Sequence, residues 1–123
     1  MVNGAHFKPS ARLLKAAEFS RVFKKAIRSS DRMLTVLIAA NDLGYPRLGL
    51  AISKKHAKRA VDRNRIKRII RESFRLNQGS LPAADFVIMA KPLTKSVINV
   101  DLFESLDNHW GRLIKKCAKS SSD

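Results

Sequence analysis

The sequence is poor in the residues that build disulfides, metal centres and protein active sites. Its 123 positions contain one cysteine, three histidines and ten acidic residues. Cys117 cannot form an internal disulfide, and His6, His56 and His109 are too far apart to show metal-ligand spacing. We therefore predict no metal site in the protein, and we interpret Cys117 as a small, reduced side chain in the core.

Long apolar segments are missing as well. No apolar run approaches the roughly 18 residues that span a bilayer, and residues 1–10 carry no apolar stretch of a secretory signal. We expect a cytoplasmic protein with no membrane contact. The length and the apolar fraction of 45% predict one folded domain over residues 1–123, with a basic arm at 1–11 and a frayed tail at 119–123.

Acidic residues are outnumbered by 25 Lys and Arg residues, which gives a formal charge of +15. Residues 54–75 alone hold ten basic and two acidic side chains. Such an imbalance predicts a polyanionic partner that neutralises the self-repulsion. The ten acids are scattered, whereas hydrolysis of a phosphodiester by a protein needs converging carboxylates or an acid/base pair of His or Lys. We predict no catalytic residue in this chain.

Hydrophobic periodicity predicts the order α, β, β, α, β, α. The expected helices are 15–27, 60–76 and 101–119, and the expected strands are 33–40, 47–53 and 86–90. The turn chemistry of residues 42–46 suggests that the first two strands form a hairpin. In the second of them, Gly49, Ala51 and Ser53 alternate with bulky residues, which indicates that another element approaches this small face closely.

The helix expected at 60–76 has two chemically opposite faces. At 100° per residue, its apolar stripe contains Ile66, Ile69, Ile70, Ser73 and Phe74, and this face should meet the sheet. The opposite face is almost entirely cationic. Arg63 falls at the edge of the apolar stripe, so its guanidinium needs a partner.

Residues 53–55 and 60–71, with Arg63-Asn64-Arg65 at their centre, resemble the signature of the protein subunit of bacterial ribonuclease P. Residues 19–24, 47–50 and 85–87 match that family in order and spacing, and the resemblance covers residues 12–110. It implies an accessory subunit of an endoribonuclease that removes the 5′ leader from precursor tRNA. The implied partners are the catalytic RNA and precursor tRNA, with no obligate protein partner and no cofactor bound by the protein. The Mg²⁺ that the reaction requires would belong to the RNA.

Two groups of site residues follow. The first would bind the phosphates of the catalytic RNA, since guanidiniums pair with them bidentately: Lys54, Lys55, Arg59, Arg63, Asn64, Arg65, Lys67, Arg68 and Arg71. A solvated charge run is the alternative. The second would hold the single-stranded leader, partly by stacking on aromatic rings: Phe19, Phe23, Lys24, Leu37 and Lys91. Core packing of Phe19 and Phe23 is the alternative there.

The resemblance also implies the fold, an α+β sandwich with a four-stranded sheet. The basic helix would make a left-handed βαβ crossover, as in the second domain of ribosomal protein S5, between an N-terminal and a C-terminal helix. General rules favour right-handed crossovers, so this feature comes from the family alone. The missing fourth strand fits best if residues 29–40 break into two strands. A ribosomal-type protein with only a structural RNA-binding role remains the alternative function.

Overall fold

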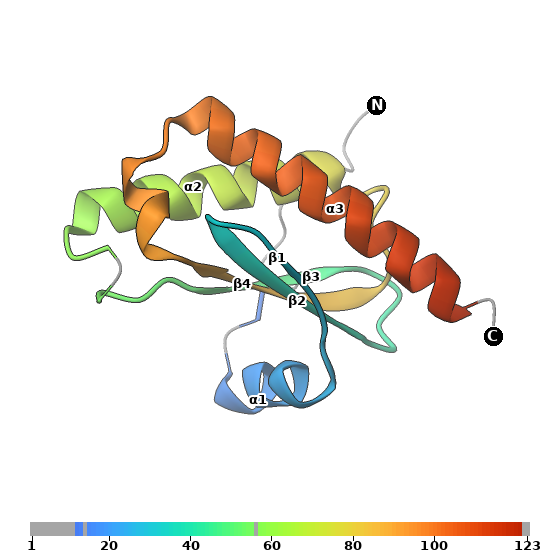
Figure 1. Cartoon of the computed structure of the whole chain (residues 1–123). Coiled ribbons are helices and arrows are strands. Elements are labelled where there is room, and N and C mark those ends of the chain that lie inside the picture. Colours follow the sequence, from blue (N-terminus) through green and yellow to red (C-terminus); the bar gives the residue numbers. More distant parts are fainter. Residues whose placement is uncertain (1–11, 14, 56, 122–123) are drawn as a thin grey trace.

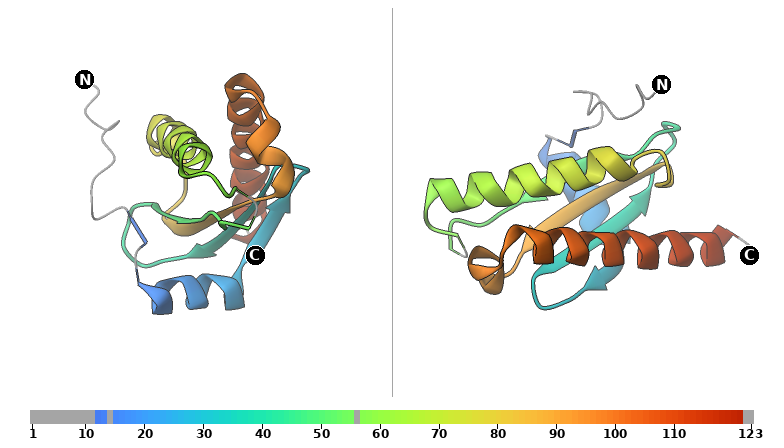
Figure 2. Two further views of the ribbon diagram at one scale, coloured as in Figure 1. Left: turned by 90° about the vertical axis from the view of Figure 1, so that its left-hand side faces the viewer. Right: turned by 90° about the horizontal axis from the view of Figure 1, so that it is seen from above.

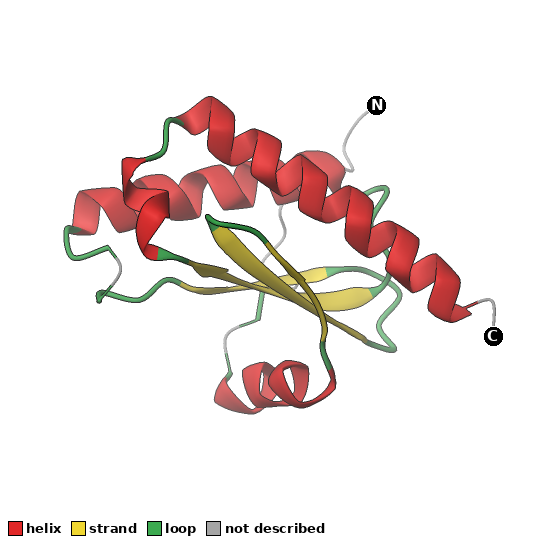
Figure 3. Ribbon diagram, viewed as in Figure 1, coloured by secondary structure: helices red, strands yellow, loops and turns green. Residues whose placement is uncertain are grey.

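The computed structural model describes residues 12–13, 15–55 and 57–121, with the backbone alone at 95 and 117–121. A four-stranded sheet lies between two helices on one face and one helix on the other (Figures 1 and 3). The elements in chain order are α1 (Ala16–Lys25), β1 (Ile27–Ser30), β2 (Leu34–Ala40), β3 (Arg47–Ala51), α2 (Ala60–Asn77), β4 (Ala84–Ala90), the short 3-10 helix η3 (Pro92–Ser96) and α3 (Asn99–Ser121).

The strand order is β1-β2-β4-β3, which corrects the predicted hairpin. β2 and β3 do not pair, because β4 lies between them, antiparallel to β2 and parallel to β3. β4 is buried along nearly all of its length, as expected of a central strand that needs a neighbour on each side. The 41–46 segment passes the end of β4, where the Asn41 amide donates to the Ala83 carbonyl (3.2 Å).

The parallel pair β3 and β4 is joined through α2. Seen from the helix side with both strands pointing up, β4 lies to the left of β3 (Figure 2), so the crossover is left-handed, as the resemblance implies. The fourth strand also lies where it was expected, because residues 29–40 divide between β1 and β2. The division occurs at Asp31, whose Oδ1 accepts from the amides of Met33 (2.8 Å) and Leu34 (2.9 Å). β1 begins at Ile27, so α1 ends two residues earlier than predicted.

The main core lies between the sheet and the pair α2 and α3. The buried residues of α2 are Ile66, Ile69, Ile70, Ser73 and Phe74, which confirms the predicted stripe. Phe74, Phe86 and Trp110 make edge-to-face contacts with ring centroids 5.6–6.1 Å apart. The Trp110 indole donates to Ser73 Oγ (2.9 Å), which satisfies the one hydroxyl of the buried stripe.

A smaller core lies on the other face, beneath α1, and is formed by Leu13, Val22, Leu37, Ala39 and Val87. It explains the small face of β3. A Cβ atom at Gly49 would lie 2.8 Å from the Phe19 ring and 2.9 Å from Leu13 Cβ, closer than carbon atoms approach. The absence of a side chain at Gly49 is therefore what allows α1 to pack against β3.

Both edges of the sheet are covered. Beside β3, Arg12 forms a parallel bridge with Leu48, and the Leu13 amide donates to the Leu48 carbonyl (2.8 Å). Beside β1, Lys116 Nζ of α3 donates to the Arg28 carbonyl (2.7 Å). None of the described helices is both long and apolar enough to cross a membrane. The predicted basic arm, His6 and His56 lie outside the described residues, as does the side chain of Cys117.

Candidate nucleic-acid interface

Packing of the α2 stripe fixes which side chains of the basic segment face solvent. Because Ile66, Ile69 and Ile70 are buried, the opposite side of the helix is turned outward. Six of the nine residues predicted to bind catalytic RNA are exposed: Lys54, Lys55, Arg59, Asn64, Arg68 and Arg71. The other three, Arg63, Arg65 and Lys67, are half-buried. The structure thus brings the predicted residues onto one side of α2 and the loop before it.

Arg63 has the partner that its position required. Its Nη1 donates to the carbonyls of Ala57 (2.9 Å) and Lys58 (2.8 Å) in the loop that precedes α2. Backbone carbonyls carry no net charge, so the guanidinium keeps its positive charge while it holds the loop. Arg63 thereby ties the segment after Lys54 and Lys55 to the first turns of α2.

Arg65 connects α2 to the start of α3. Its Nη1 donates to Asn99 Oδ1 (2.7 Å), and its Nη2 lies 3.4 Å from the Thr94 carbonyl. Both acceptors are again neutral. Of the Arg63-Asn64-Arg65 triplet, only Asn64 is exposed, and the two arginines fix the helix relative to its neighbours.

Little of the charge on α2 is neutralised within the protein. The two acids of α2 pair locally, Asp62 with Arg59 (3.7 Å) and Glu72 with Arg75 (2.5 Å). The hydrogen bond from Arg75 lowers the pKa of Glu72, so this carboxyl stays ionised. Five further cations have no carboxylate partner in the described part of the chain: Lys54, Lys55, Lys67, Arg68 and Arg71. We call these five residues the cationic surface of α2.

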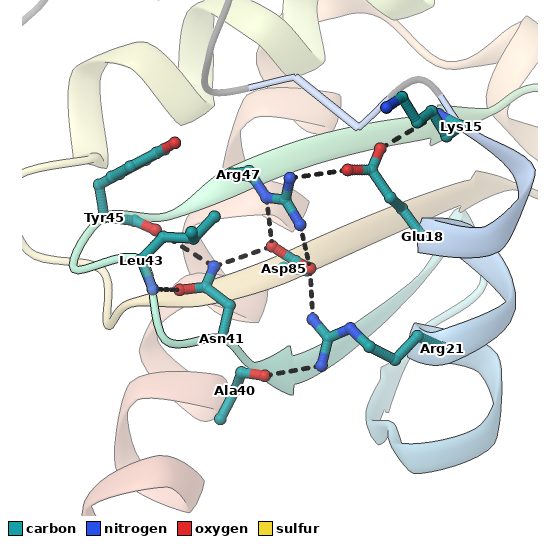
Figure 4. A network of polar contacts seen from close by, with 9 residues as sticks. All are labelled: Lys15, Glu18, Arg21, Ala40, Asn41, Leu43, Tyr45, Arg47 and Asp85. Carbon is teal, nitrogen blue, oxygen red and sulfur yellow. Dashed lines mark hydrogen bonds and ion pairs between the residues drawn. The ribbon is translucent and has the colours of Figure 1, made fainter.

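The arginines near α1 have a different environment, which sequence analysis missed (Figure 4). The Asp85 side chain is fully buried, and Arg47 donates to it twice, from Nε to Oδ1 and from Nη2 to Oδ2 (both 2.8 Å). Asn41 Nδ2 donates to Oδ1 (2.8 Å), and Arg21 of α1 donates to Oδ2. Glu18 of α1 accepts from Arg47 Nη1 (2.8 Å). We call these five residues the Asp85 cluster.

The Asp85 cluster fixes α1 on the sheet through compensated charges. Burial raises the pKa of Asp85, but the hydrogen bonds from Arg47, Asn41 and Arg21 outweigh burial and leave the pKa below its usual value. The hydrogen bonds of Arg47 with Asp85 and Glu18 raise the pKa of its guanidinium. A signal for this cluster existed in the sequence, because an aspartate inside the apolar run 84–90 needs a cationic partner once it is buried.

The residues predicted to bind the leader lie in different environments. Phe23 is 50% exposed and Lys24 is exposed, both on α1. Phe19 is half-buried against Gly49, and Leu37 is buried beneath α1. Lys91 Nζ donates to Ser30 Oγ (2.7 Å) and to the Asp31 carbonyl, at the turn between β1 and β2. Of these five residues, only Phe23 and Lys24 are therefore exposed.

A second polar cluster that the sequence did not reveal joins α3 to the β1–β2 turn. His109 is fully buried, with Nδ1 2.7 Å from Ser29 Oγ. Its Nε2 lies 3.1 Å from Asp31 Oδ2, without the alignment of a hydrogen bond. Ser105 donates to the same oxygen (2.5 Å). Burial lowers the pKa of His109, and the attraction of Asp31 offsets only part of that effect.

Comparison with known proteins gives a consistent result. The chain matches the family "Ribonuclease P" over residues 7–114. It is 50% identical over 119 residues to the ribonuclease P protein component of Methylococcus capsulatus, covering 97% of this chain and 93% of that protein. The corresponding protein of Photobacterium profundum is 47% identical over 112 residues, with coverage of 91% and 95%.

Solved structures show the same fold. The RNase P protein of Staphylococcus aureus superposes with a TM-score of 0.78 at 33% identity, covering 85% of this chain and 95% of that one. The RNase P protein of Thermotoga maritima gives a TM-score of 0.74 at 30% identity, with coverage of 82% and 96%. The left-handed crossover and the four-stranded sheet are therefore features shared with experimentally determined structures.

Proposed function

The chain belongs to the ribonuclease P protein family, and from this premise we propose that it assists a catalytic RNA in removing the 5′ leader from precursor tRNA. Its direct role is to bind RNA, and the cleavage chemistry is assigned to the RNA subunit. The observation that carries the proposal is the cationic surface of α2 and the loop before it, where no carboxylate of the described residues pairs with Lys54, Lys55, Lys67, Arg68 or Arg71. Phosphates supply the missing counter-charge.

The magnesium ions of the reaction are assigned to the RNA. The described residues contain no group of three His, Cys, Asp or Glu side chains that could hold a metal ion. The acids that sequence analysis found scattered are engaged in internal contacts at Asp85, Glu18 and Glu72. The contribution of the protein is then electrostatic and positional. We place it in the cytoplasm together with its RNA.

We assign leader contact first to Phe23 and Lys24, which support it by their exposure on α1. An exposed aromatic ring can stack on a base without selecting its identity, which suits a leader of variable sequence. Phe19 and Leu37 act beneath them by supporting α1. Lys91 lies at the β1–β2 turn beside Asn108 and Arg112 of α3, so it would contact RNA on that side of the sheet and not beside Phe23 and Lys24.

The decisive experiment is reconstitution with the RNase P RNA of the same organism at low magnesium concentration. We expect the protein to raise the rate of precursor tRNA cleavage, and Arg68→Gln with Arg71→Gln to weaken RNA-subunit binding about tenfold at 50 mM salt. Lys25→Gln, on exposed α1, is the charge control. RNA binding without any effect on cleavage would instead indicate a purely structural, ribosomal-type role.

Leader contact is tested separately with Phe23→Ala. We expect weaker binding of precursor tRNA by the assembled enzyme, by roughly 1–3 kcal/mol if one base stacks on the ring, with mature tRNA unaffected. Leu43→Ala, at a position 46% exposed in the 41–46 segment, is the control for loss of surface apolar area. Equal losses for precursor and mature tRNA, with a lower melting temperature, would show that Phe23 supports the fold instead.

A further inference from the structure

A second basic surface lies along the edge strand β1 and the C-terminal half of α3. Its members, which we call the β1–α3 surface, are Arg28, Arg32, Lys91, Arg112, Lys115 and Lys116. All of them are exposed except Lys91, which is half-buried. β1 and β3 are the two opposite edges of the sheet, and α3 contacts β1 whereas α2 contacts β3. The β1–α3 surface is therefore separate from the cationic surface of α2 (Figures 1 and 2).

Neutral groups hold three of these cations in place. Lys116 Nζ donates to the Arg28 carbonyl (2.7 Å), Arg112 Nη1 lies 3.3 Å from Ser29 Oγ, and Lys91 Nζ donates to Ser30 Oγ (2.7 Å). None of the ion pairs found among the described residues includes a member of the surface. These three side chains are thus positioned without losing their charge, which lowers the entropic cost of meeting an anion.

A hollow of about 570 Å³ opens within this surface, between the β1–β2 turn and α3. Arg32, Lys91, Arg112 and Asn108 contribute to its lining. Asp31 is the one carboxylate in the lining, and its partners are neutral: Oδ1 accepts from two backbone amides and Oδ2 from Ser105. Asp31 therefore offsets one of the three positive charges, and the hollow keeps a net positive charge with cationic hydrogen-bond donors, a combination that suits a phosphate group.

We propose that the β1–α3 surface binds the sugar-phosphate backbone of a second RNA segment, with one phosphate in the hollow. A small anion would need the hollow alone, whereas Arg28, Lys115 and Lys116 continue the positive charge along the edge of the sheet. A chain of phosphates uses both. The inference rests on the proposed function, and the segment can come from the catalytic RNA or from the precursor tRNA.

The test compares Arg32→Gln with Lys25→Gln, two exposed cations on opposite sides of the sheet. Arg32→Gln should weaken RNA binding about threefold at 50 mM salt and reduce the slope of log K against log[salt] by about one. Adding Arg112→Gln should bring the loss to about tenfold and the slope change to about two. Lys25→Gln should change the affinity by less than about twofold. Circular dichroism melting verifies that each variant is folded.

Two binding measurements identify the source of the segment. One uses the RNase P RNA alone, and the other uses the assembled holoenzyme with precursor tRNA and with mature tRNA. A loss in the first measurement assigns the β1–α3 surface to the catalytic RNA, and a loss confined to precursor tRNA assigns it to the substrate. Losses no larger than those of Lys25→Gln in both measurements overturn the inference.

Arg68→Gln with Arg71→Gln, measured beside these variants, separates this inference from the proposed function. If the α2 variant binds RNA weakly and the Arg32 and Arg112 variants bind normally, the second surface is wrong and the proposed function stands. If the α2 variant binds normally while the Arg32 and Arg112 variants do not, the main RNA contact lies on the β1–α3 surface. Failure of the unaltered protein to bind either RNA overturns both.

Discussion

The arginines of α2 and those of the Asp85 cluster have the same chemistry, but their charges are compensated to different extents within the protein. Arg21 and Arg47 form ion pairs with the same buried carboxylate, that of Asp85, so their charge is compensated inside the protein. Among the described residues, Arg68 and Arg71 have no carboxylate partner, and they keep their charge at the surface. The difference between the two groups of arginines is one buried aspartate, so a count of basic residues alone does not show which charges are available to a partner.

Asp85→Ala should have the largest effect on this comparison. It removes the carboxylate to which Arg47, with a side chain only 15% exposed, donates twice, so the free energy of unfolding should fall by about 3–5 kcal/mol. Denaturant unfolding measures the loss, and amide hydrogen exchange should show the strongest deprotection in α1. Glu18→Gln, which removes a partly exposed partner of Arg47, is the milder control. A loss below 1 kcal/mol for Asp85→Ala would mean that apolar packing alone holds α1.

Gly49→Ala tests the apolar half of the same attachment. The new Cβ would meet the Phe19 ring at 2.8 Å and Leu13 Cβ at 2.9 Å, so these neighbours must shift, at a cost of about 1–3 kcal/mol. Gly79→Ala is the matched control, because a Cβ there meets nothing within 4 Å. Combining Gly49→Ala with Phe19→Leu should recover part of the loss in a double-mutant cycle. Equal stability of the two alanine variants would exclude a tight contact between α1 and β3.

The buried His109 should make the free energy of unfolding depend on pH. Its pKa is lowered in the folded protein, so folding favours the neutral imidazole, and stability present above the unfolded pKa is lost as the pH falls through that value. Asp31, Arg112 and Lys91 are the charged groups that act on it. The free energy of unfolding should decrease from pH 7.5 to 5.5, and His109→Gln should flatten this slope. Identical slopes for the two proteins would remove His109 as the titrating group.

Arg68→Gln with Arg71→Gln should have the smallest effect on stability. Both side chains are exposed without a carboxylate partner, and Arg71 is one turn from both Lys67 and Arg75, so their loss relieves repulsion. We expect the free energy of unfolding to change by no more than about 0.5 kcal/mol while RNA affinity falls. A destabilisation comparable with that of Gly49→Ala would show that these arginines belong to the architecture.

The sequence predicted the features that depend on the spacing of residues within one helix or strand. The buried stripe of α2 and the close approach to Gly49 both follow from spacing that a helix or strand imposes on its own residues. Periodicity could not predict the strand order. β4 follows α2 in the chain, yet it lies between β2 and β3 in the sheet. In the Asp85 cluster, Arg47 and Arg21 are 38 and 64 positions from Asp85 in the sequence. The only local indication of the cluster was therefore a single aspartate in an apolar run.

The family resemblance supplied the remaining features. A left-handed crossover contradicts the general preference, and nothing in the periodicity of residues 47–90 distinguishes one hand from the other. The roles of Arg63 and Arg65 were predicted as RNA contacts, and their neutral backbone and amide partners add a bracing role without removing their charge. The RNA contacts themselves stay predictions that the variants above can test.

The covered margins of the sheet bear on how the protein behaves when it is concentrated and has no RNA to bind. An open strand is a template on which a second copy can add its own strand, which is how aggregation through sheets begins. Here the Leu13 amide donates a hydrogen bond to a carbonyl of β3. Lys116 donates one to a carbonyl of β1 and places a positive charge at that edge. Mutual repulsion of molecules that each carry a charge of +15 acts in the same direction. We expect these features to oppose self-association of the protein before it meets its RNA.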